Sequence, residues 1–328
     1  MLHTRGLAVL AVAAAASTLM ITPAAAGTNT VRYAWVDGCA KKDYTVPCGP
    51  WTLTMRSGKD LVLKDAVVFP ESAGGKVDKE ANAPLAVSGN GRYVNYFRKS
   101  DSRLVVRDVV TGSVKALPGK AAILPKGLGM SDLDLGFSND GRRLVIDYLD
   151  FSATKPSVVV DLQAGTTSKL PGGEFVQSFS PDGEYVLTSR STDDNTTEFA
   201  VYDGKGDKMH SQVVPQVVSN NSPIALADDG ATVALVITGS KKARLRTYDL
   251  STDEVSEAVT LRYPATESPT RLLWETSGKL SVWNMRSNAN GDLQGYTKRT
   301  IDPNSGASPL ADSFRFKSGI WTWWLPGD

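Results

Sequence analysis

The stretch Phe179-Ser-Pro-Asp-Gly183 is one of five related copies in the chain, and their repetition decides the fold. In each copy a short apolar run leads through polar residues to a glycine, and a second β-rich run follows. The five glycines and a degenerate sixth recur 41–50 residues apart, at Gly91, Gly141, Gly183, Gly230, Gly278 and Gly319. Self-similarity at such a period is typical of repeat architectures.

A second landmark follows each of the first five glycines, namely a β-rich run that ends in aspartate. An Asp-Gly or Asn-Gly pair supplies the positive φ of a tight hairpin, and a terminal aspartate can cap the next turn through its carboxylate. Each unit is therefore predicted to hold four short strands, near 85–88, 92–97, 103–108 and 114–117 in the first. The five aspartates are Asp108, Asp161, Asp203, Asp249 and Asp302.

These units predict an all-β chain with the fold of a β-propeller. Four short strands cannot bury both faces of their sheet alone, whereas units packed around an axis bury one another's faces. The segment Phe314–Trp324 looks like the first two strands of a unit, and residues 51–65 look like the last two. We therefore expect N- and C-terminal strands to close the ring in one blade, which gives six blades, or seven if Val31–Val36 starts another.

The repeat motif resembles that of known propellers. Phe179-Ser-Pro-Asp-Gly183 is similar to the motif of TolB-type propellers, and the Val-Tyr-Asp203 and Val-Arg-Asp108 endings resemble those of YncE-type and WD-repeat propellers. The resemblance covers about residues 84–325 and implies the fold, although the full WD signature is missing. Secreted bacterial members of such families often serve in extracellular assemblies, including antibacterial toxin particles.

The first 26 residues predict a secretory signal peptide. One basic residue, Arg5, precedes an apolar run from Leu7 to Ile21, and the small residues Ala24-Ala25-Ala26 supply a cleavage site. A membrane anchor is the alternative, but the run is shorter than a spanning helix requires. The sequence thus predicts a secreted, extracellular protein with one propeller domain over residues 27–328, in which 27–70 and 310–328 form the closure blade.

Export places the only two cysteines, Cys39 and Cys48, in an oxidising compartment, and they are predicted to form a local disulfide. Free thiols are the alternative. A zinc site is disfavoured because the pair lacks Cys-x-x-Cys spacing and nearby histidines.

The composition argues against several function classes. The chain carries 36 basic and 35 acidic residues, so no strong field attracts nucleic acid or an anionic membrane, and neither is expected as a partner after signal removal. Only His3 and His210 could serve a catalytic triad, and no Gly-x-Ser-x-Gly elbow is present. No catalytic residue, cofactor or metal site is predicted, and the chain is not expected to be an enzyme. Calcium at the turn aspartates Asp140, Asp182, Asp228 and Asp229 stays an alternative.

Two features are candidates for a binding surface. Trp321 and Trp323 alternate along a predicted strand and form an aromatic platform if they are not core residues, and Asp193 and Asp194 lie in a long loop. The favoured function is a non-enzymatic module that binds protein, for example as a subunit of an extracellular toxin particle. The alternatives are a polysaccharide or cell-wall binder and, less favoured, a carbohydrate-active enzyme with clustered carboxylates at the propeller axis.

Overall fold

Each copy of the turn motif forms a tight hairpin in the structure, a computed structural model that describes residues 29–149, 154–239, 242–288 and 290–328. All five turn glycines have positive φ, which ranges from 68° at Gly230 to 75° at Gly141. The aspartates cap the following turns as predicted: the Asp108 carboxylate, for instance, accepts hydrogen bonds from the backbone N–H groups of Val110 and Thr111. The predicted signal peptide, residues 1–26, lies outside the described residues.

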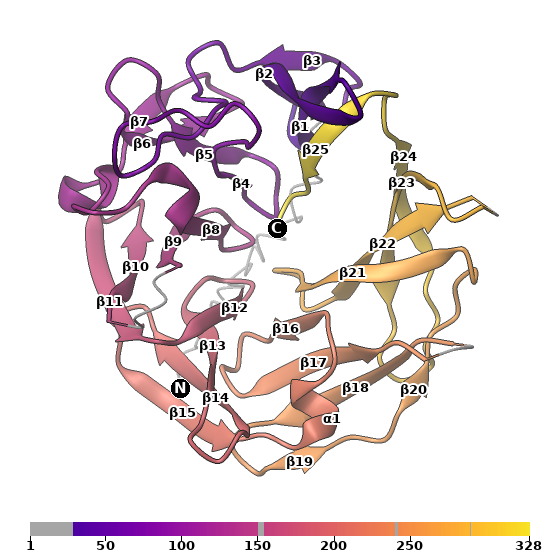
Figure 1. The fold of residues 1–328 in the computed structure, drawn as a ribbon. Helices are drawn as coiled ribbons and strands as arrows, with labels where there is room; N and C mark the ends of the chain where they lie inside the picture. Colours follow the sequence, from indigo (N-terminus) through magenta and orange to yellow (C-terminus); the bar gives the residue numbers. More distant parts are fainter. Residues whose placement is uncertain (1–28, 150–153, 240–241, 289) are drawn as a thin grey trace, which may run out of the picture.

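The described strands form six antiparallel sheets that surround a common axis as the blades of a propeller (Figure 1). In blades 1 to 5 the strands run outward from the axis in chain order. Blade 1 holds β4 (Leu85–Val87), β5 (Tyr93–Phe97), β6 (Leu104–Asp108) and β7 (Val114–Ala116). Blade 2 holds β8 (Leu133–Phe137), β9 (Arg143–Tyr148), β10 (Pro156–Asp161) and β11 (Thr166–Gly172). Blade 3 holds β12 (Phe175–Phe179), β13 (Tyr185–Ser191), β14 (Thr197–Asp203) and β15 (Lys208–Val213).

The other three blades differ in how their outer strands are made. Blade 4 holds β16 (Ile224–Leu226), β17 (Thr232–Ile237) and β18 (Arg244–Asp249), and its edge is split into β19 (Glu254–Val255) and β20 (Val259–Thr260). Blade 5 holds β21 (Glu267–Trp274), β22 (Leu280–Ser287), β23 (Leu293–Ile301) and β24 (Leu310–Arg315). The closure blade holds, from the axis outward, β25 (Ile320–Trp324), β1 (Val31–Lys41), β2 (Tyr44–Met55) and β3 (Asp60–Val62). The short helices are α1 (Gln216–Ser219), η1 (Gly119–Ala122) and η2 (Met130–Asp132).

The ring is closed by N- and C-terminal strands in one blade, and six blades are confirmed. Strand β25 pairs antiparallel with β1, which brings Trp323 opposite Trp35 and Trp324 opposite Ala34. The prediction for residues 310–328 needs a correction, because β24 is the outer strand of blade 5 and only β25 belongs to the closure blade. Gly319 accordingly precedes the innermost strand instead of following it. Its φ of 81° marks a tight turn, but a positive φ does not reveal which turn of the blade it is.

Antiparallel order gives the disc two different faces. The turns between first and second strands, which carry the repeated glycines, lie on one face, which we call the turn face. The connections between second and third strands, and those from one blade to the next, lie on the opposite face, called the loop face. Loops on a rigid scaffold are the usual carriers of function, and the two faces of this disc are built from different loops.

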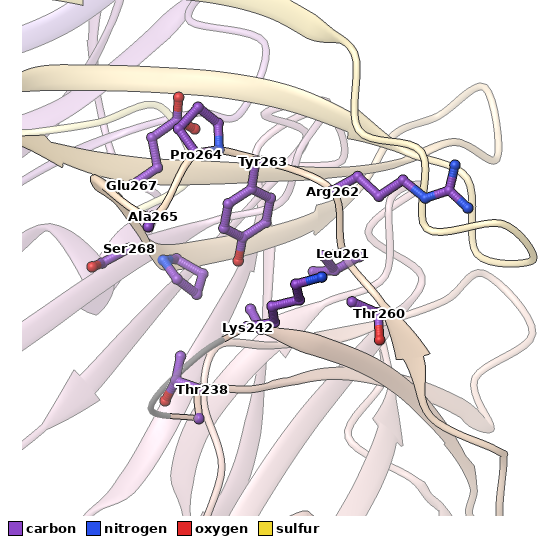
Figure 2. A pocket seen from close by; sticks show the side chains of 13 residues that line it. Thr238, Lys242, Thr260, Leu261, Arg262, Tyr263, Pro264, Ala265, Glu267 and Ser268 are labelled. Atoms are coloured by element: carbon purple, nitrogen blue, oxygen red, sulfur yellow. The ribbon is translucent and has the colours of Figure 1, made fainter.

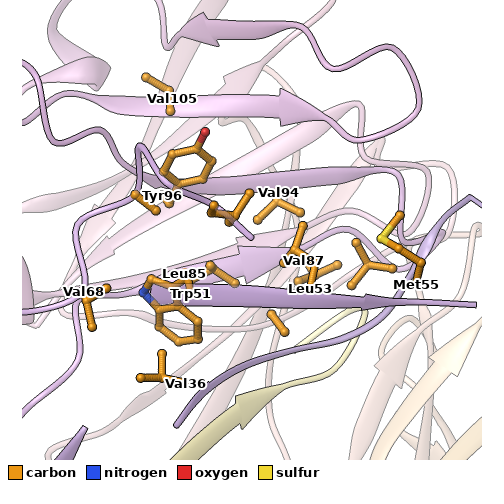
Figure 3. Close-up of a cluster of buried hydrophobic side chains, with 14 residues drawn as sticks. Val36, Trp51, Leu53, Met55, Val68, Leu85, Val87, Val94, Tyr96 and Val105 are labelled. Carbon is orange, nitrogen blue, oxygen red and sulfur yellow. The ribbon is translucent and has the colours of Figure 1, made fainter. Parts of the chain in front are cut away.

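The core lies between the blades. Figure 3 shows one such cluster, in which Trp51 and Leu53 of the closure blade pack against Leu85, Val94 and Tyr96 of blade 1. Both Trp51 and Tyr96 are fully buried. Similar clusters of apolar side chains lie between other blades, which is how sheets with two apolar faces become stable in a ring.

The predicted disulfide is present. Cys39 on β1 and Cys48 on β2 are bonded near the end of the hairpin that joins these strands, with their Cα atoms 5.8 Å apart. Among the residues that the structure describes, no helix has the length and apolar character needed to cross a membrane.

Candidate functional site

A cleft of about 920 Å³ opens on the loop face between blades 4 and 5 (Figure 2). One wall is formed by four residues that lie between β17 and β18, namely Thr238, Gly239, Lys242 and Ala243. The other wall is the crossing from β20 to β21, residues 260–269. This volume is within the usual range of ligand-binding pockets.

The cleft arises because the edge of blade 4 is split and the chain then crosses to blade 5. Leu261 is buried and its N–H donates to the Ala243 carbonyl, which anchors the start of the crossing on blade 4. The Arg262 N–H donates to the Gly306 carbonyl of blade 5, 3.0 Å away. The N–H of Glu267 bonds back to the Pro264 carbonyl, so the crossing is held at both ends.

A buried ion pair forms the blade 5 end of this cleft. The Arg299 guanidinium donates to both carboxylate oxygens of Glu267, from Nε at 2.7 Å and from Nη2 at 2.8 Å. The Thr297 hydroxyl and the Asn284 amide donate to the same carboxylate. Burial alone would raise the pKa of Glu267, but the hydrogen bonds and charge of Arg299, together with these donors, lower it below the ordinary value. Glu267 therefore stays ionised, and its oxygens are already occupied.

Tyr263 places an unused hydrogen-bond donor in the cleft. Its hydroxyl oxygen is buried and has no hydrogen-bond partner among the described residues. Burial and, to a smaller extent, the negative charge of Glu267 raise the pKa of Tyr263 to about 12, although the charge of Arg299 partly opposes them. The hydroxyl is therefore protonated at neutral pH and can donate. A buried hydroxyl without a partner is unfavourable, so this donor is suited to an acceptor that enters the cleft.

The walls of the cleft also carry unpaired positive charge. Lys242 and Arg262 line the cleft and Arg244 begins the adjoining strand β18; all three are exposed. Within the described part of the chain, none of the three forms an ion pair, whereas Glu267 is neutralised by Arg299. Figure 2 shows Tyr263 and Lys242 facing the same space, while the Arg262 side chain points outward. The cleft thus offers donors and positive charge, with no free carboxylate among its described lining residues.

The propeller axis offers little room where its lining residues meet. Phe137, Ser178, Arg271 and Trp274, from the inner strands of blades 2, 3 and 5, surround a space of about 10 Å³ together with Gly327. Such a space holds about one water molecule. The C-terminal tail contributes to this filling, because the Gly327 N–H donates to the Val87 carbonyl of blade 1.

The tryptophans predicted as a binding surface are placed in the closure blade. The Trp323 ring lies 4.8 Å from the Phe316 ring and belongs to the cluster between the closure blade and blade 5. Trp321 lies near the loop-face end of β25, is partly exposed, and donates from Nε1 to the Thr45 carbonyl at 3.2 Å. Both rings are partly buried, and Trp323 is the one that packs into an apolar cluster.

Asp193 and Asp194 are exposed in the loop between β13 and β14, on the loop face of blade 3. Blade 3 lies across the ring from the closure blade (Figure 1), so the structure does not bring these aspartates together with Trp321. The proposal that these four residues form a binding surface stays a prediction.

Asp140 and Asp182 take part in the hydrogen bonds of their own turns, and His210 lies on an outer strand. Asp140 and Asp182 each accept a hydrogen bond from a serine two residues earlier, within the turn motif. No group of three or more metal-ligating side chains occurs in the described ranges. His210 lies on β15, the outer strand of blade 3, and His3 is outside the described residues.

The cleft is not predicted by the repeat pattern of the sequence. The sequence holds one indication of it, the basic run Lys241-Lys242-Ala243-Arg244-Leu245-Arg246 in the fourth unit. Around the connection between the second and third strands, this unit carries more positive charge than the other units. The run alone could not be matched to Tyr263, because that residue lies beyond the unit's outer strands.

No protein-family model matches the chain, and no curated protein sequence is similar to it. Solved structures share its architecture at low similarity. TolB from Acinetobacter baumannii matches 88% of this chain and 66% of its own, at 14% identity and a TM-score of 0.45. The β-propeller domain of Cps50 (Swd1) from Myceliophteria thermophila matches 71% of each chain at 16% identity and a TM-score of 0.41. The predicted resemblance to TolB-type and WD-repeat propellers is confirmed at the level of the fold alone.

These comparisons correct the prediction that the chain is not an enzyme. The similar structures include enzymes, among them an oligogalacturonate lyase from Vibrio parahaemolyticus, which matches 86% of this chain and 84% of its own at 9% identity and a TM-score of 0.42. A hydrazine synthase, a luciferin-regenerating enzyme and a puromycin-hydrolyzing peptidase also match. The absence of a histidine-based triad therefore does not exclude catalysis on this fold, and these likenesses assign no activity to the chain.

Proposed function

We propose that this chain is an exported interaction module that binds another protein on its loop face, with the cleft between blades 4 and 5 as part of the contact. The observation that carries the proposal is the set of unused donors in that cleft, the Tyr263 hydroxyl and the Lys242 and Arg262 cations. Groups of this kind gain most from a partner that supplies acceptors.

A stable protein–protein contact needs about 800 Å² on each partner, which is more than one cleft provides. The loop face offers further features beside it. Phe175, at the start of β12, is 58% exposed and lines a second hollow of about 360 Å³ between blades 3 and 4. The loop with Asp193 and Asp194 borders this hollow. A partner that spans both hollows would cover a continuous part of the loop face.

Export is supported by two independent features. The first 26 residues have the pattern of a secretory signal, and the Cys39–Cys48 disulfide is of a kind that persists in oxidising compartments. Export predicts a mature chain that begins at Gly27, which N-terminal sequencing of protein from the culture supernatant would check.

Site-specific photocrosslinking tests where a partner binds. p-Benzoylphenylalanine would replace Ala265, which is exposed in the cleft wall, or Thr111, which is exposed on the turn face of blade 1. We expect irradiation of culture supernatant to yield one defined protein adduct from position 265 and none from position 111, as identified by mass spectrometry. An adduct from position 111 alone, or from neither position, would contradict the proposal.

Membership of an extracellular toxin particle is a narrower form of the same proposal, and the identity of the crosslinked protein would decide it. Polysaccharide binding is the second candidate. It has weaker support, because Trp323 packs between blades and the Trp321 indole N–H already donates to the Thr45 carbonyl.

A further inference from the structure

We propose that the cleft between blades 4 and 5 recognises a side-chain carboxylate in an acidic segment of a partner protein, which accepts the Tyr263 O–H and pairs with Lys242. The inference rests on the proposed function and adds the chemistry of the group that is bound.

The cleft has more hydrogen-bond donors than free acceptors. The Tyr263 hydroxyl is buried, protonated and unpartnered among the described residues, so it needs an acceptor. Glu267 cannot supply one, because its two oxygens already receive the Arg299, Thr297 and Asn284 donors. The acceptor for the Tyr263 hydroxyl must therefore be a group other than the Glu267 carboxylate.

The charge of the cleft favours an anionic acceptor. Lys242 and Arg262 line the cleft without ion-pair partners in the described ranges, and Arg244 stands beside them. A neutral acceptor would satisfy Tyr263 but leave these cations unpaired, whereas an anionic acceptor satisfies both. A hydrogen bond to a charged acceptor is also stronger than one to a neutral acceptor.

The lining of the cleft favours a peptide over other anions. The cleft walls combine the two cations with the apolar surfaces of Ala243, Pro264 and Pro269. Such a mixed lining suits a peptide in which carboxylates alternate with aliphatic side chains. Nucleic acid or a sulfated glycan, which carries repeated charge, would be favoured by a wider basic surface than the chain's near-neutral composition provides.

The test measures binding of a fluorescein-labelled hexaglutamate peptide by fluorescence polarisation, with hexaglutamine as the uncharged probe. We expect hexaglutamate to bind and hexaglutamine not to bind. Tyr263→Phe should weaken hexaglutamate binding roughly tenfold, since one hydrogen bond to a charged acceptor is lost. Lys242→Gln should weaken it and reduce its dependence on salt.

Two controls make the result specific to the cleft. Lys99→Gln removes one exposed charge from the loop face of blade 1 and should leave affinity unchanged. Tyr263→Phe should not lower the melting temperature, because the lost hydroxyl has no partner within the described chain. The inference is overturned if hexaglutamine binds equally well, if Tyr263→Phe binds like wild type, or if Lys99→Gln weakens binding as much as Lys242→Gln.

Photocrosslinking separates this inference from the proposed function. If the adduct at position 265 persists when Tyr263→Phe and Lys242→Gln are combined, the loop face binds a protein but not through a carboxylate in this cleft. If wild-type protein binds hexaglutamate and position 265 gives no adduct, the cleft recognises carboxylates and the protein-binding proposal fails.

Discussion

Gly183 shows that the repeated glycine serves two purposes. Its φ is 73°, in the region that disfavours side chains, and a Cβ atom there would lie 3.0 Å from the Ser138 Cβ of the preceding blade. Gly141 is similar, because a Cβ at that position would meet Tyr93 of blade 1. The sequence predicts the backbone conformation from the Asp-Gly pair, but the contact between blades appears only in the structure.

Gly278 allows these two effects to be separated. Its φ is 74°, yet no heavy atom lies within 4 Å of where its Cβ would be. We predict that Gly278→Val lowers the free energy of unfolding by about 1–2 kcal/mol through backbone strain alone. Gly183→Val should cost at least about 1 kcal/mol more, because the side chain also collides with blade 2.

Urea denaturation of both variants would measure the two costs as shifts of the unfolding midpoint. Equal shifts would show that the turn glycines do not contribute to packing between blades. A midpoint for Gly183→Val that matches wild type would remove the hairpin strain argument as well.

Glu267 makes stability depend on pH in a defined direction. Its pKa is lower in the folded chain than the ordinary value, because the Arg299 and Thr297 hydrogen bonds outweigh its burial. The stabilisation is therefore complete above the unfolded-state pKa of about 4.3 and is lost as the pH falls through the lower folded-state value. We predict that Glu267→Gln costs on the order of 3 kcal/mol near pH 7, since it leaves Arg299 unpaired.

Unfolding of wild type and Glu267→Gln by guanidinium chloride, measured at several pH values, would check this prediction. The difference in free energy of unfolding between the two proteins should shrink as the pH falls below about 4. Glu257→Gln, at an exposed position on the outer side of blade 4, serves as the matched control and should show no such trend. A difference that is constant with pH would mean that the carboxylate charge is not what stabilises the folded state.

At the scale of elements, blade 5 explains why the closure was only partly predicted. Strands β21 and β22 are each eight residues long and β23 is nine, so the outer strand β24 begins only at Leu310. The motif around Gly319 then looked like a sixth hairpin, although it is the turn that leads into β25. Local patterns mark turns and strands, but they do not show to which sheet a strand near the boundary of two units belongs.

The closure blade should depend on its single C-terminal strand. We predict that removal of Ile320–Asp328 causes aggregation, because it leaves the β1 edge unpaired and exposes the clusters on both sides of the blade. Trp323, Trp324 and Leu325 pack into those clusters, and burying such side chains contributes roughly 1.5–3 kcal/mol each. Their sum rivals the ~5–15 kcal/mol net stability of a whole domain.

Size-exclusion chromatography and thermal melting would test the truncated chain. Two point variants keep the test informative if it aggregates completely. Trp324→Ala, in the cluster with blade 1, should lower the melting temperature strongly, whereas Trp321→Ala should have a small effect. A truncated chain that stays monomeric with an unchanged melting transition would show that β25 is not structural.

At the scale of the whole molecule, the ring and its blade number follow from the sequence, because they depend on two local landmarks repeated in one order. The cleft does not follow in this way. Tyr263 lies after the outer strands of blade 4, its neighbour Lys242 comes from a loop about twenty residues earlier, and the Glu267–Arg299 pair is within blade 5. No period links these positions, and their proximity results from the chain crossing between two blades.

The way in which the ring closes also has a consequence in time. Pairing within each of blades 1 to 5 joins neighbouring segments of the chain, so these sheets can form soon after their strands emerge. The contact of Ala34 with Trp324 joins residues 290 positions apart and must wait for almost the entire chain. The Cys39–Cys48 bridge keeps β1 in a hairpin during that wait, so the last strand meets an edge that is already formed. Pairing of β1 with β25 is thus expected to be the last step of folding and the first contact to break on unfolding. The rate at which this pair of strands separates would then set the lifetime of the native ring.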